Sequence, residues 1–211
     1  MINCKCSFIT ESGSRLILTD SIGKRVKVTQ GATVFFRGDT IGMLGDRVVH
    51  GQVDVTGHAK ILIHVGINDI ISLINSKCKT NITVHDILRR FKCLREIIRR
   101  RNTYATLLFS AILPRDSRQF HLYSSYLYGV NFALEKWCAK SGGSCVFLDT
   151  CKLFVDNGSP RDELFARSDG LHPNGMGDDR LQAFYSQALS TAYIIEKVKS
   201  KRVKRLRSLP Y

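Results

Sequence analysis

Residues 60–69 read KILIHVGIND, an almost unbroken apolar run that is followed by a glycine, an asparagine and an aspartate. Apolar side chains at consecutive positions are typical of a strand buried on both faces, as in the centre of a parallel sheet. We predict such a strand over 60–65. Polar residues directly after it would lie at the edge of the sheet where parallel α/β proteins bind their ligands.

On both sides of this run, short apolar stretches alternate with amphipathic segments, the pattern of a parallel sheet covered by helices. Further strands are predicted over 15–18, 33–36, 106–112 and 144–148. Helices are predicted over 40–50, 83–101, 120–140 and 177–199. Thr83 and Asp86 have the spacing of a capping box at the start of one of these helices.

This alternation predicts one α/β domain over 1–196, a three-layer α/β/α sandwich around a central parallel sheet, as in flavodoxin-like folds. A basic C-terminal tail follows over 197–211. The segments 70–79 and 115–120 are expected to be loops beside the substrate pocket.

Charge is the most unusual feature of the composition, with a formal net charge of +14 in 211 residues. The basic side chains gather in the predicted helix 83–101 and in the tail. Such clusters attract phosphate polyanions, but they also occur as solvated surfaces without a partner. The candidate nucleic-acid contacts are Arg89, Arg90, Arg99, Arg100, Arg101, Lys201, Arg202, Lys204 and Arg205.

The seven cysteines indicate a reducing compartment rather than a disulfide framework, because their number is odd and residues 1–10 lack a secretory leader. We therefore expect an intracellular protein, cytoplasmic or nuclear. The pair Cys4 and Cys6 has no second pair to complete a metal site, so no metal is predicted. No apolar stretch approaches the length of a membrane span.

Four polar clusters lie at predicted strand ends or before the last predicted helix, and they consist of Asp20-Ser21, Gly38, Gly66-Asn68-Asp69, and Asp169 with His172. Each has a common structural explanation when taken alone. A serine after a strand is usually a helix cap, and an asparagine in a loop usually bonds its own backbone. Their joint order along the chain is what indicates a site.

The four clusters resemble the ordered sequence blocks of the SGNH, or GDSL-like, hydrolase superfamily. The first block, usually Gly-Asp-Ser, is matched by 19–21 with threonine at the first position. The second block supplies Gly38, and the third, Gly-x-Asn-Asp, is matched in full by 66–69. The last, Asp-x-x-His, is matched by Asp169 and His172. The wording HVGINDI before a basic helix is also similar to esterase-like domains of LINE-type retrotransposons.

The resemblance implies a serine esterase that hydrolyses small acyl esters, acetyl or lipid, without metal or organic cofactor. Ser21 would be the nucleophile, and His172 would be the base that takes its proton. Asp169 would hold the imidazole in the correct tautomer.

The resemblance also implies an oxyanion hole made by the backbone N–H groups of Ser21 and Gly38 and by the Asn68 amide. Asp20, Gly66 and Asp69 would support it. The alternative is a weak or inactive module on the same scaffold that binds nucleic acid through the basic clusters.

Two residues next to these blocks carry separate expectations. His64 lies in an apolar strand, where a histidine is more often hydrogen-bonded in the core than catalytic. Thr19 replaces the usual glycine, and a β-branched residue would be strained there if the backbone needed a positive φ.

Overall fold

The computed structural model of the protein describes residues 14–75 and 83–190. Five strands form a sheet in the order β2-β1-β3-β4-β5, and every neighbouring pair is parallel. The strands are β1 (Ser14–Thr19), β2 (Gly31–Phe35), β3 (His58–His64), β4 (Thr106–Ser110) and β5 (Cys145–Leu148). Their carboxyl ends therefore all meet at one edge of the sheet.

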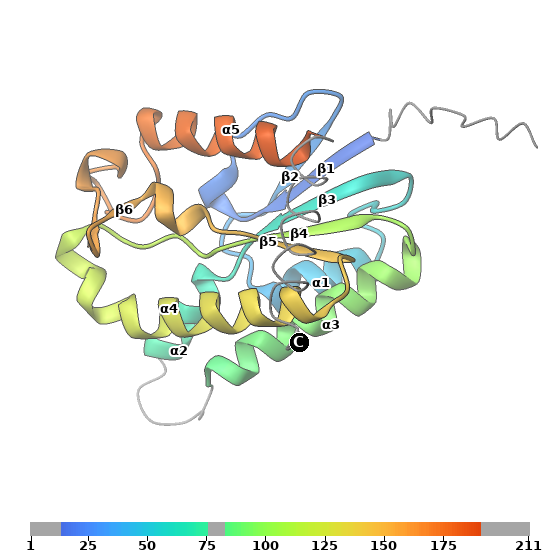
Figure 1. The fold of residues 1–211 in the computed structure, drawn as a ribbon, viewed down its shortest axis with the longest axis horizontal. Coiled ribbons are helices and arrows are strands. Elements are labelled where there is room, and N and C mark those ends of the chain that lie inside the picture. The colour runs from blue at the N-terminus through green and yellow to red at the C-terminus, as the bar shows by residue number, and fades with distance from the viewer. Residues whose placement is uncertain (1–13, 76–82, 191–211) are drawn as a thin grey trace, which may run out of the picture.

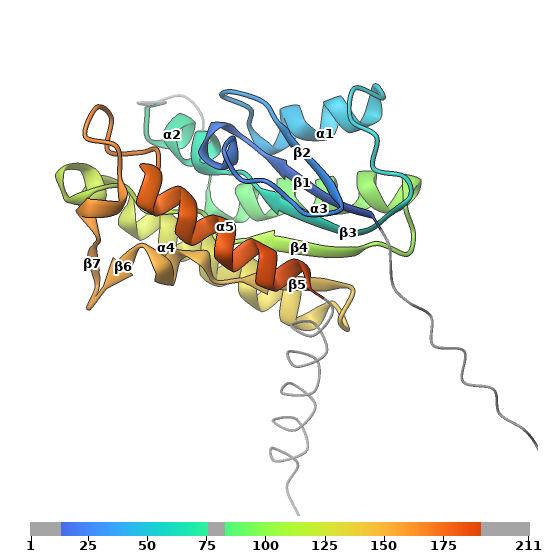
Figure 2. The ribbon, with the colours of Figure 1, turned by 90° about the horizontal axis from the view of Figure 1, so that it is seen from above.

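The helices cover both faces of this sheet. They are α1 (Ile41–Val49), α2 (Ile67–Asn75), α3 (Val84–Arg101), α4 (Ser117–Lys140) and α5 (Gly175–Leu189). Figure 1 shows α5 above the sheet and α1, α3 and α4 below it, and Figure 2 shows α5 from above, running over the strands. This arrangement confirms the predicted three-layer α/β/α sandwich with a central parallel sheet.

Three short helices and a hairpin complete the described chain. They are η1 (Ser21–Gly23), η2 (Thr150–Leu153) and η3 (Asp162–Leu164), with β6 (Val155–Asp156) paired to β7 (Ser159–Pro160). All three short helices lie beyond the carboxyl ends of β1 and β5, which is where the chain leaves the sheet.

The apolar runs and the capping signal that predicted the elements are present in the structure. Residues 60–64 of β3 are all buried, as a central strand between two helical layers requires. At the start of α3, the Thr83 side chain accepts from the Asp86 N–H and the Asp86 side chain accepts from the Thr83 N–H. This reciprocal pair confirms the predicted capping box.

The segment after β3 is a helix, which corrects the prediction of a loop over 70–79. Helix α2 begins at Ile67 and ends at Asn75, so Asn68 and Asp69 lie in its first turn. Residues 76–79 lie outside the described residues. Only Val65 and Gly66 separate this helix from β3, and a helix this short shows too few apolar repeats to be recognised from its pattern.

The ends of three other elements also differ from the prediction. Helix α4 begins at Ser117 rather than at residue 120, so most of the predicted loop 115–120 is helical, and β4 ends at Ser110 rather than at 112. Helix α5 ends at Leu189, because Ser190 is extended and its hydroxyl donates to the Gln187 carbonyl at 2.6 Å. Residues 191–199 of the predicted helix, and the tail 197–211, lie outside the described residues.

Candidate active site

Ser21 is the first residue after the turn that ends β1. The Asp20 side chain accepts a hydrogen bond from the Ile22 N–H at 2.9 Å and thereby caps the short helix η1. This cap holds the chain in a tight turn at the carboxyl edge of the sheet. The Ser21 side chain is half-buried there, while Asp20 itself is buried.

His172 contacts Ser21 from the loop before α5. Its Nε2 lies 2.9 Å from Ser21 Oγ, and its Nδ1 lies 2.7 Å from Asp169 Oδ2. The residues at the two ends of this chain of hydrogen bonds, Ser21 and Asp169, are brought together from opposite ends of the sequence. The arrangement is a hydroxyl, an imidazole and a carboxylate in series.

Asp169 is held ionised although it belongs to a partly buried turn. Its Oδ1 accepts from the backbone N–H groups of Leu171 at 2.8 Å and His172 at 3.0 Å. Partial burial raises the pKa of Asp169, but these two N–H groups and the His172 side chain lower it more, so the pKa lies below its usual value. A carboxylate in this state can stabilise a proton on His172.

Three candidate hydrogen-bond donors, Ser21, Gly38 and Asn68, follow the carboxyl ends of β1, β2 and β3. Among the described residues, the backbone N–H groups of Ser21 and Gly38 have no hydrogen-bond partner. Gly38 has a φ of +78°, a conformation that turns its backbone as side-chain-bearing residues rarely do. Asn68 donates one amide hydrogen to the Asp39 carbonyl at 2.9 Å, which fixes the amide and leaves its second hydrogen for another acceptor.

Gly66 supports Asn68 through its backbone and its lack of a side chain. Its φ is +123°, and a Cβ at this position would lie 2.7 Å from Cδ1 of Ile112. Only glycine fits there. The chain can therefore leave β3 and enter α2 within two residues, which places Asn68 at the carboxyl edge of the sheet.

Each of the three donor residues has a buried aspartate as its neighbour in the sequence: Asp20 beside Ser21, Asp39 beside Gly38, and Asp69 beside Asn68. Two of these carboxylates are paired with arginines. Arg47 donates to both Asp39 oxygens at 2.6 and 3.0 Å, and Arg90 donates to Asp69 at 2.6 Å. Asp69 also accepts the Ile41 N–H at 2.9 Å and so joins α2 to the start of α1.

Asp20 is the exception, because no arginine reaches it and its Oδ2 has no hydrogen-bond partner in the described part of the chain. Burial, helped by the charges of Asp69 and Asp39 and opposed by the Ile22 N–H, raises the pKa of Asp20 to about 7. The pKa values of Asp20 and Asp169 are therefore displaced in opposite directions.

His64 is buried and hydrogen-bonded, as expected for a core histidine. Its Nδ1 lies 2.7 Å from the Tyr185 hydroxyl of α5, and burial lowers the pKa of His64 to about 4. Sequence reasoning did not find Tyr185, because 121 residues separate the two partners. Thr19 shows no positive φ, and its hydroxyl accepts the Gly23 N–H at 3.2 Å, so the expected backbone strain is not present.

The candidate nucleic-acid contacts are partly engaged within the molecule. Arg90 pairs with Asp69, Arg99 donates to the Thr103 and Ser144 carbonyls at 2.8 Å, and Arg101 donates to the Val49 carbonyl at 2.7 Å. Arg89 pairs with Asp86 at 3.3 Å. Arg100 is exposed. The four candidates in the tail, Lys201, Arg202, Lys204 and Arg205, lie outside the described residues.

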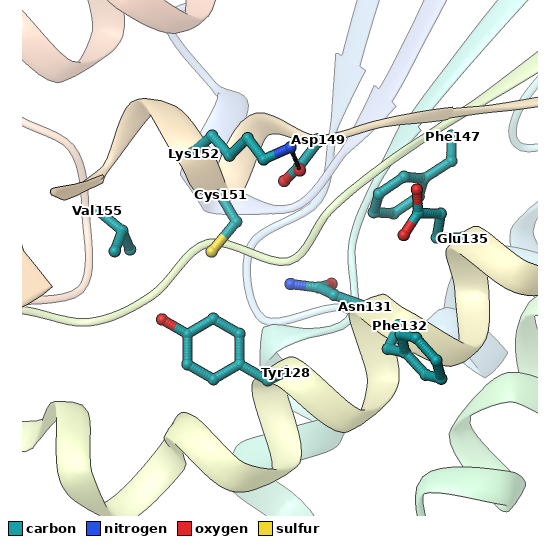
Figure 3. Close-up of a pocket in the computed structure, with 9 residues that line it drawn as sticks. All are labelled: Tyr128, Asn131, Phe132, Glu135, Phe147, Asp149, Cys151, Lys152 and Val155. Carbon is teal, nitrogen blue, oxygen red and sulfur yellow. Dashed lines mark ion pairs between the residues drawn. The ribbon is translucent and has the colours of Figure 1, made fainter. Parts of the chain in front are cut away.

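A pocket lies on the β5 side of the sheet, between α4 and the segment after β5 (Figure 3). It measures about 350 Å³ and is lined by Tyr128, Asn131, Phe132, Glu135, Phe147, Asp149, Cys151, Lys152 and Val155. Asp149 pairs with Lys152 at 2.7 Å, and burial raises the pKa of the Cys151 thiol to about 12. Its one thiol is thus held protonated, and β5 is three strands from β1.

Two classes of function find no support among residues 14–75 and 83–190. No group of three or more histidine, cysteine or acidic residues there is arranged to hold a metal ion. None of the helices in these ranges is long and apolar enough to cross a bilayer.

Comparison with solved structures finds one fold repeatedly. A protein from Streptococcus pneumoniae described as a platelet activating factor shares 20% identity over 87% of each chain, with a TM-score of 0.69. A GDSL-like lipase from Bacteroides thetaiotaomicron shares 16% identity over 87% of this chain and 91% of that one, with a TM-score of 0.65. The chain has the fold of the SGNH hydrolases.

The other comparisons add little to this SGNH fold. The esterase domain of a zebrafish retrotransposon ORF1 protein shares 24% identity over 83% of this chain and 97% of that domain, at a TM-score of 0.44. That score supports no argument, so the resemblance to retrotransposon domains stays a prediction. No protein-family model and no curated protein sequence matches the chain.

Proposed function

We propose that the protein is a serine esterase that hydrolyses small acyl esters through an acyl-enzyme. The observation that carries this proposal is the position of His172, with Nε2 at 2.9 Å from Ser21 Oγ and Nδ1 at 2.7 Å from Asp169. These are the contacts that a general base needs with its nucleophile and with the group that orients it.

In the first half of the reaction, Ser21 Oγ attacks the ester carbonyl carbon while its proton passes to His172 Nε2. The carbonyl oxygen becomes an oxyanion and accepts hydrogen bonds from the N–H groups of Ser21 and Gly38 and from the Asn68 amide. His172 then gives its proton to the oxygen of the leaving alcohol, and the acyl group remains on Ser21.

In the second half, water replaces the alcohol. His172 takes a proton from the water as it attacks the acyl carbon, and the same donors stabilise the second oxyanion. The Ser21 oxygen leaves with the proton from His172, which releases the acid and restores the enzyme. The ionised Asp169 stabilises the imidazolium that forms in both halves.

The test is hydrolysis of p-nitrophenyl acetate by the purified protein and by Ser21→Ala. We expect the variant to lose at least about 10³-fold in kcat/KM, because no other side chain takes the place of the nucleophile. Ser72→Ala, an exposed serine of α2, is the matched control and should keep the activity of the original protein. Equal rates for the original protein and Ser21→Ala would contradict the proposal.

A further inference from the structure

An oxyanion hole backed by negative charge stabilises an anion poorly, so the three aspartates behind the donors have to be neutralised. Asp39 and Asp69 are neutralised by the arginines of α1 and α3. Asp20 directly precedes Ser21, and no arginine pairs with it among the described residues. The structure must neutralise it in another way.

A small cavity on the inner side of Asp20 supplies the means. It measures about 10 Å³, close to the space that one water needs, and Asp20 and His64 are its only polar side chains. Asp20 Oδ2 has no hydrogen-bond partner, and His64 uses only Nδ1 in the hydrogen bonds of the described residues. One water between Oδ2 and Nε2 of His64 would satisfy both atoms.

We propose that Asp20 carries a proton that it donates, through one water in this cavity, towards His64, and that oxyanion stabilisation at Ser21 requires this proton. The functional half of the proposal rests on the esterase function proposed above. His64 and Tyr185 are positioning residues in this scheme, since they act through Asp20 and do not touch the substrate.

The hydroxyl groups next to His64 allow its tautomer to change with the protonation of Asp20. Tyr185 Oη lies 2.7 Å from His64 Nδ1 and 2.8 Å from Ser110 Oγ. Ser110 Oγ lies 2.8 Å from Thr150 Oγ1, and both hydroxyls reach the Ala111 carbonyl, at 3.1 and 2.9 Å. Each hydroxyl can donate in either direction, so His64 can change tautomer without leaving a buried group unpaired.

The hydrogen bonds around the water differ between the two protonation states of Asp20. With Asp20 protonated, Oδ2–H donates to the water, the water donates to Nε2, and Nδ1–H of His64 donates to Tyr185. With Asp20 ionised, one proton has left to solvent, Tyr185 donates to Nδ1, and the Nε2–H of His64 donates to the water, which donates to Oδ2. His64 is neutral in both states, and only the position of its hydrogen differs.

The groups around Asp20 favour the protonated state. Asp69 of α2 and Asp39 before α1 face it with negative charge, each already paired with its own arginine, Arg90 and Arg47. His64 of β3 resists protonation, because burial lowers its pKa to about 4, and burial likewise raises the pKa of Tyr185 on α5. Both arginines are paired with the other two aspartates, and in the described part of the chain no positively charged side chain pairs with Asp20.

The first measurement does not depend on catalysis. The ¹⁵N chemical shifts of the His64 ring, assigned with His64→Gln, report which nitrogen carries the hydrogen. In the original protein we expect the hydrogen to move from Nδ1 to Nε2 as the pH rises through about 7. In Asp20→Asn we expect no such change. Shifts that do not depend on pH, or that change equally in both proteins, would overturn the coupling between the Asp20 proton and the His64 tautomer.

The second measurement is the pH profile of kcat/KM on p-nitrophenyl acetate. We expect the activity of the original protein to fall about tenfold or more from about pH 7 to about pH 9, since ionised Asp20 places a charge behind the oxyanion. Asp20→Asn should hold a plateau over this range, and Tyr185→Phe should shift the fall to a different pH. Tyr104→Phe, which changes an exposed tyrosine, should keep the original profile.

These outcomes separate the two proposals. Activity that depends on Ser21 but has an alkaline plateau in the original protein would overturn the requirement for the proton and leave the esterase proposal standing. Activity independent of Ser21 would remove the esterase proposal and with it that requirement, while the ¹⁵N shifts would still decide whether the Asp20 proton sets the His64 tautomer.

Discussion

Two aspartate–histidine arrangements lie beside Ser21, and they differ in depth. Asp169 and His172 form the outer one, with side chains 43% and 28% exposed and a direct contact of 2.7 Å. Asp20 and His64 form the inner one, at 1% and 3% exposure, on either side of a cavity the size of one water. The same two residue types are thus placed in solvent-accessible and in buried surroundings within one site.

Depth shifts the pKa values of the two carboxyls in opposite directions. The outer one accepts two backbone N–H groups and lies at the surface, so its pKa is lowered. The inner one accepts a single N–H and is surrounded by apolar side chains and other carboxylates, so its pKa is raised to about 7. What an aspartate near Ser21 contributes is therefore set by its environment, so neither position can take over the role of the other.

Neutralising each aspartate with its amide isostere is the sharpest way to break this comparison. Asp169→Asn should lower kcat/KM by about 10³–10⁴-fold, because an amide can hold His172 in the wrong tautomer and cannot stabilise the imidazolium. Asp20→Asn at about pH 6 should lose tenfold at most, since Asp20 is already uncharged there. Both are read as kcat/KM on p-nitrophenyl acetate. A larger loss in Asp20→Asn than in Asp169→Asn would show that the two charge states are assigned the wrong way round.

A substitution at Asn68 tests an oxyanion donor without changing the buried aspartates. Asn68→Ala removes the side-chain donor and leaves Asp69 and Arg90 in place, so we expect a loss of about 10²–10³-fold in kcat with KM little changed. Asn75→Ala, in the last turn of the same helix and exposed, is the matched control. If Asn68→Ala instead raised KM and left kcat unchanged, the amide would bind the substrate rather than the oxyanion.

The residues of the outer arrangement could be proposed from the sequence, whereas the contacts of the inner one could be predicted only in part. Asp169 and His172 are three residues apart, and Ser21 follows an apolar run, but their grouping into one site is what the resemblance to the SGNH sequence blocks implied. Tyr185 could not be linked to His64, because their contact depends on how α5 lies over β3. A polar residue at the end of an otherwise apolar strand, such as Ser110 in β4, is the signal that a buried hydrogen-bond network was present.

The fold was predictable for a similar reason. Runs such as 60–65 specify strands through their own apolar character, and Thr83 with Asp86 specify a helix start through their own hydrogen bonds. Helix α2 depends instead on what surrounds it: Gly66 turns the chain, and Asp69 is held by Ile41 and Arg90 from two other helices. Arg90 itself was predicted as part of a basic surface, and only the structure shows that it neutralises a buried carboxylate.

Stability tests the inner arrangement without any substrate. Because folding raises the pKa of Asp20 from 3.8 to about 7, the folded protein keeps a proton that the unfolded chain has already lost in this range. The stability that Asp20 contributes is therefore complete below about pH 4 and is lost as the pH rises to about 7, at about 1.4 kcal/mol for each pH unit in the window. Asp20→Asn has no proton to lose and should lack this loss.

The measurement is the difference in the free energy of unfolding between the original protein and Asp20→Asn, taken in urea from about pH 4 to about pH 8. The difference should move in favour of Asp20→Asn as the pH rises and level off above about pH 7. Asp54→Asn is the control, because hydrogen bonds from Thr56 lower the pKa of that exposed carboxylate below 3.8, so its difference should change little above about pH 5. A flat difference for Asp20→Asn would mean that Asp20 is ionised in the folded protein and that its charge is compensated by other groups, which would remove the distinction between the inner and outer arrangements.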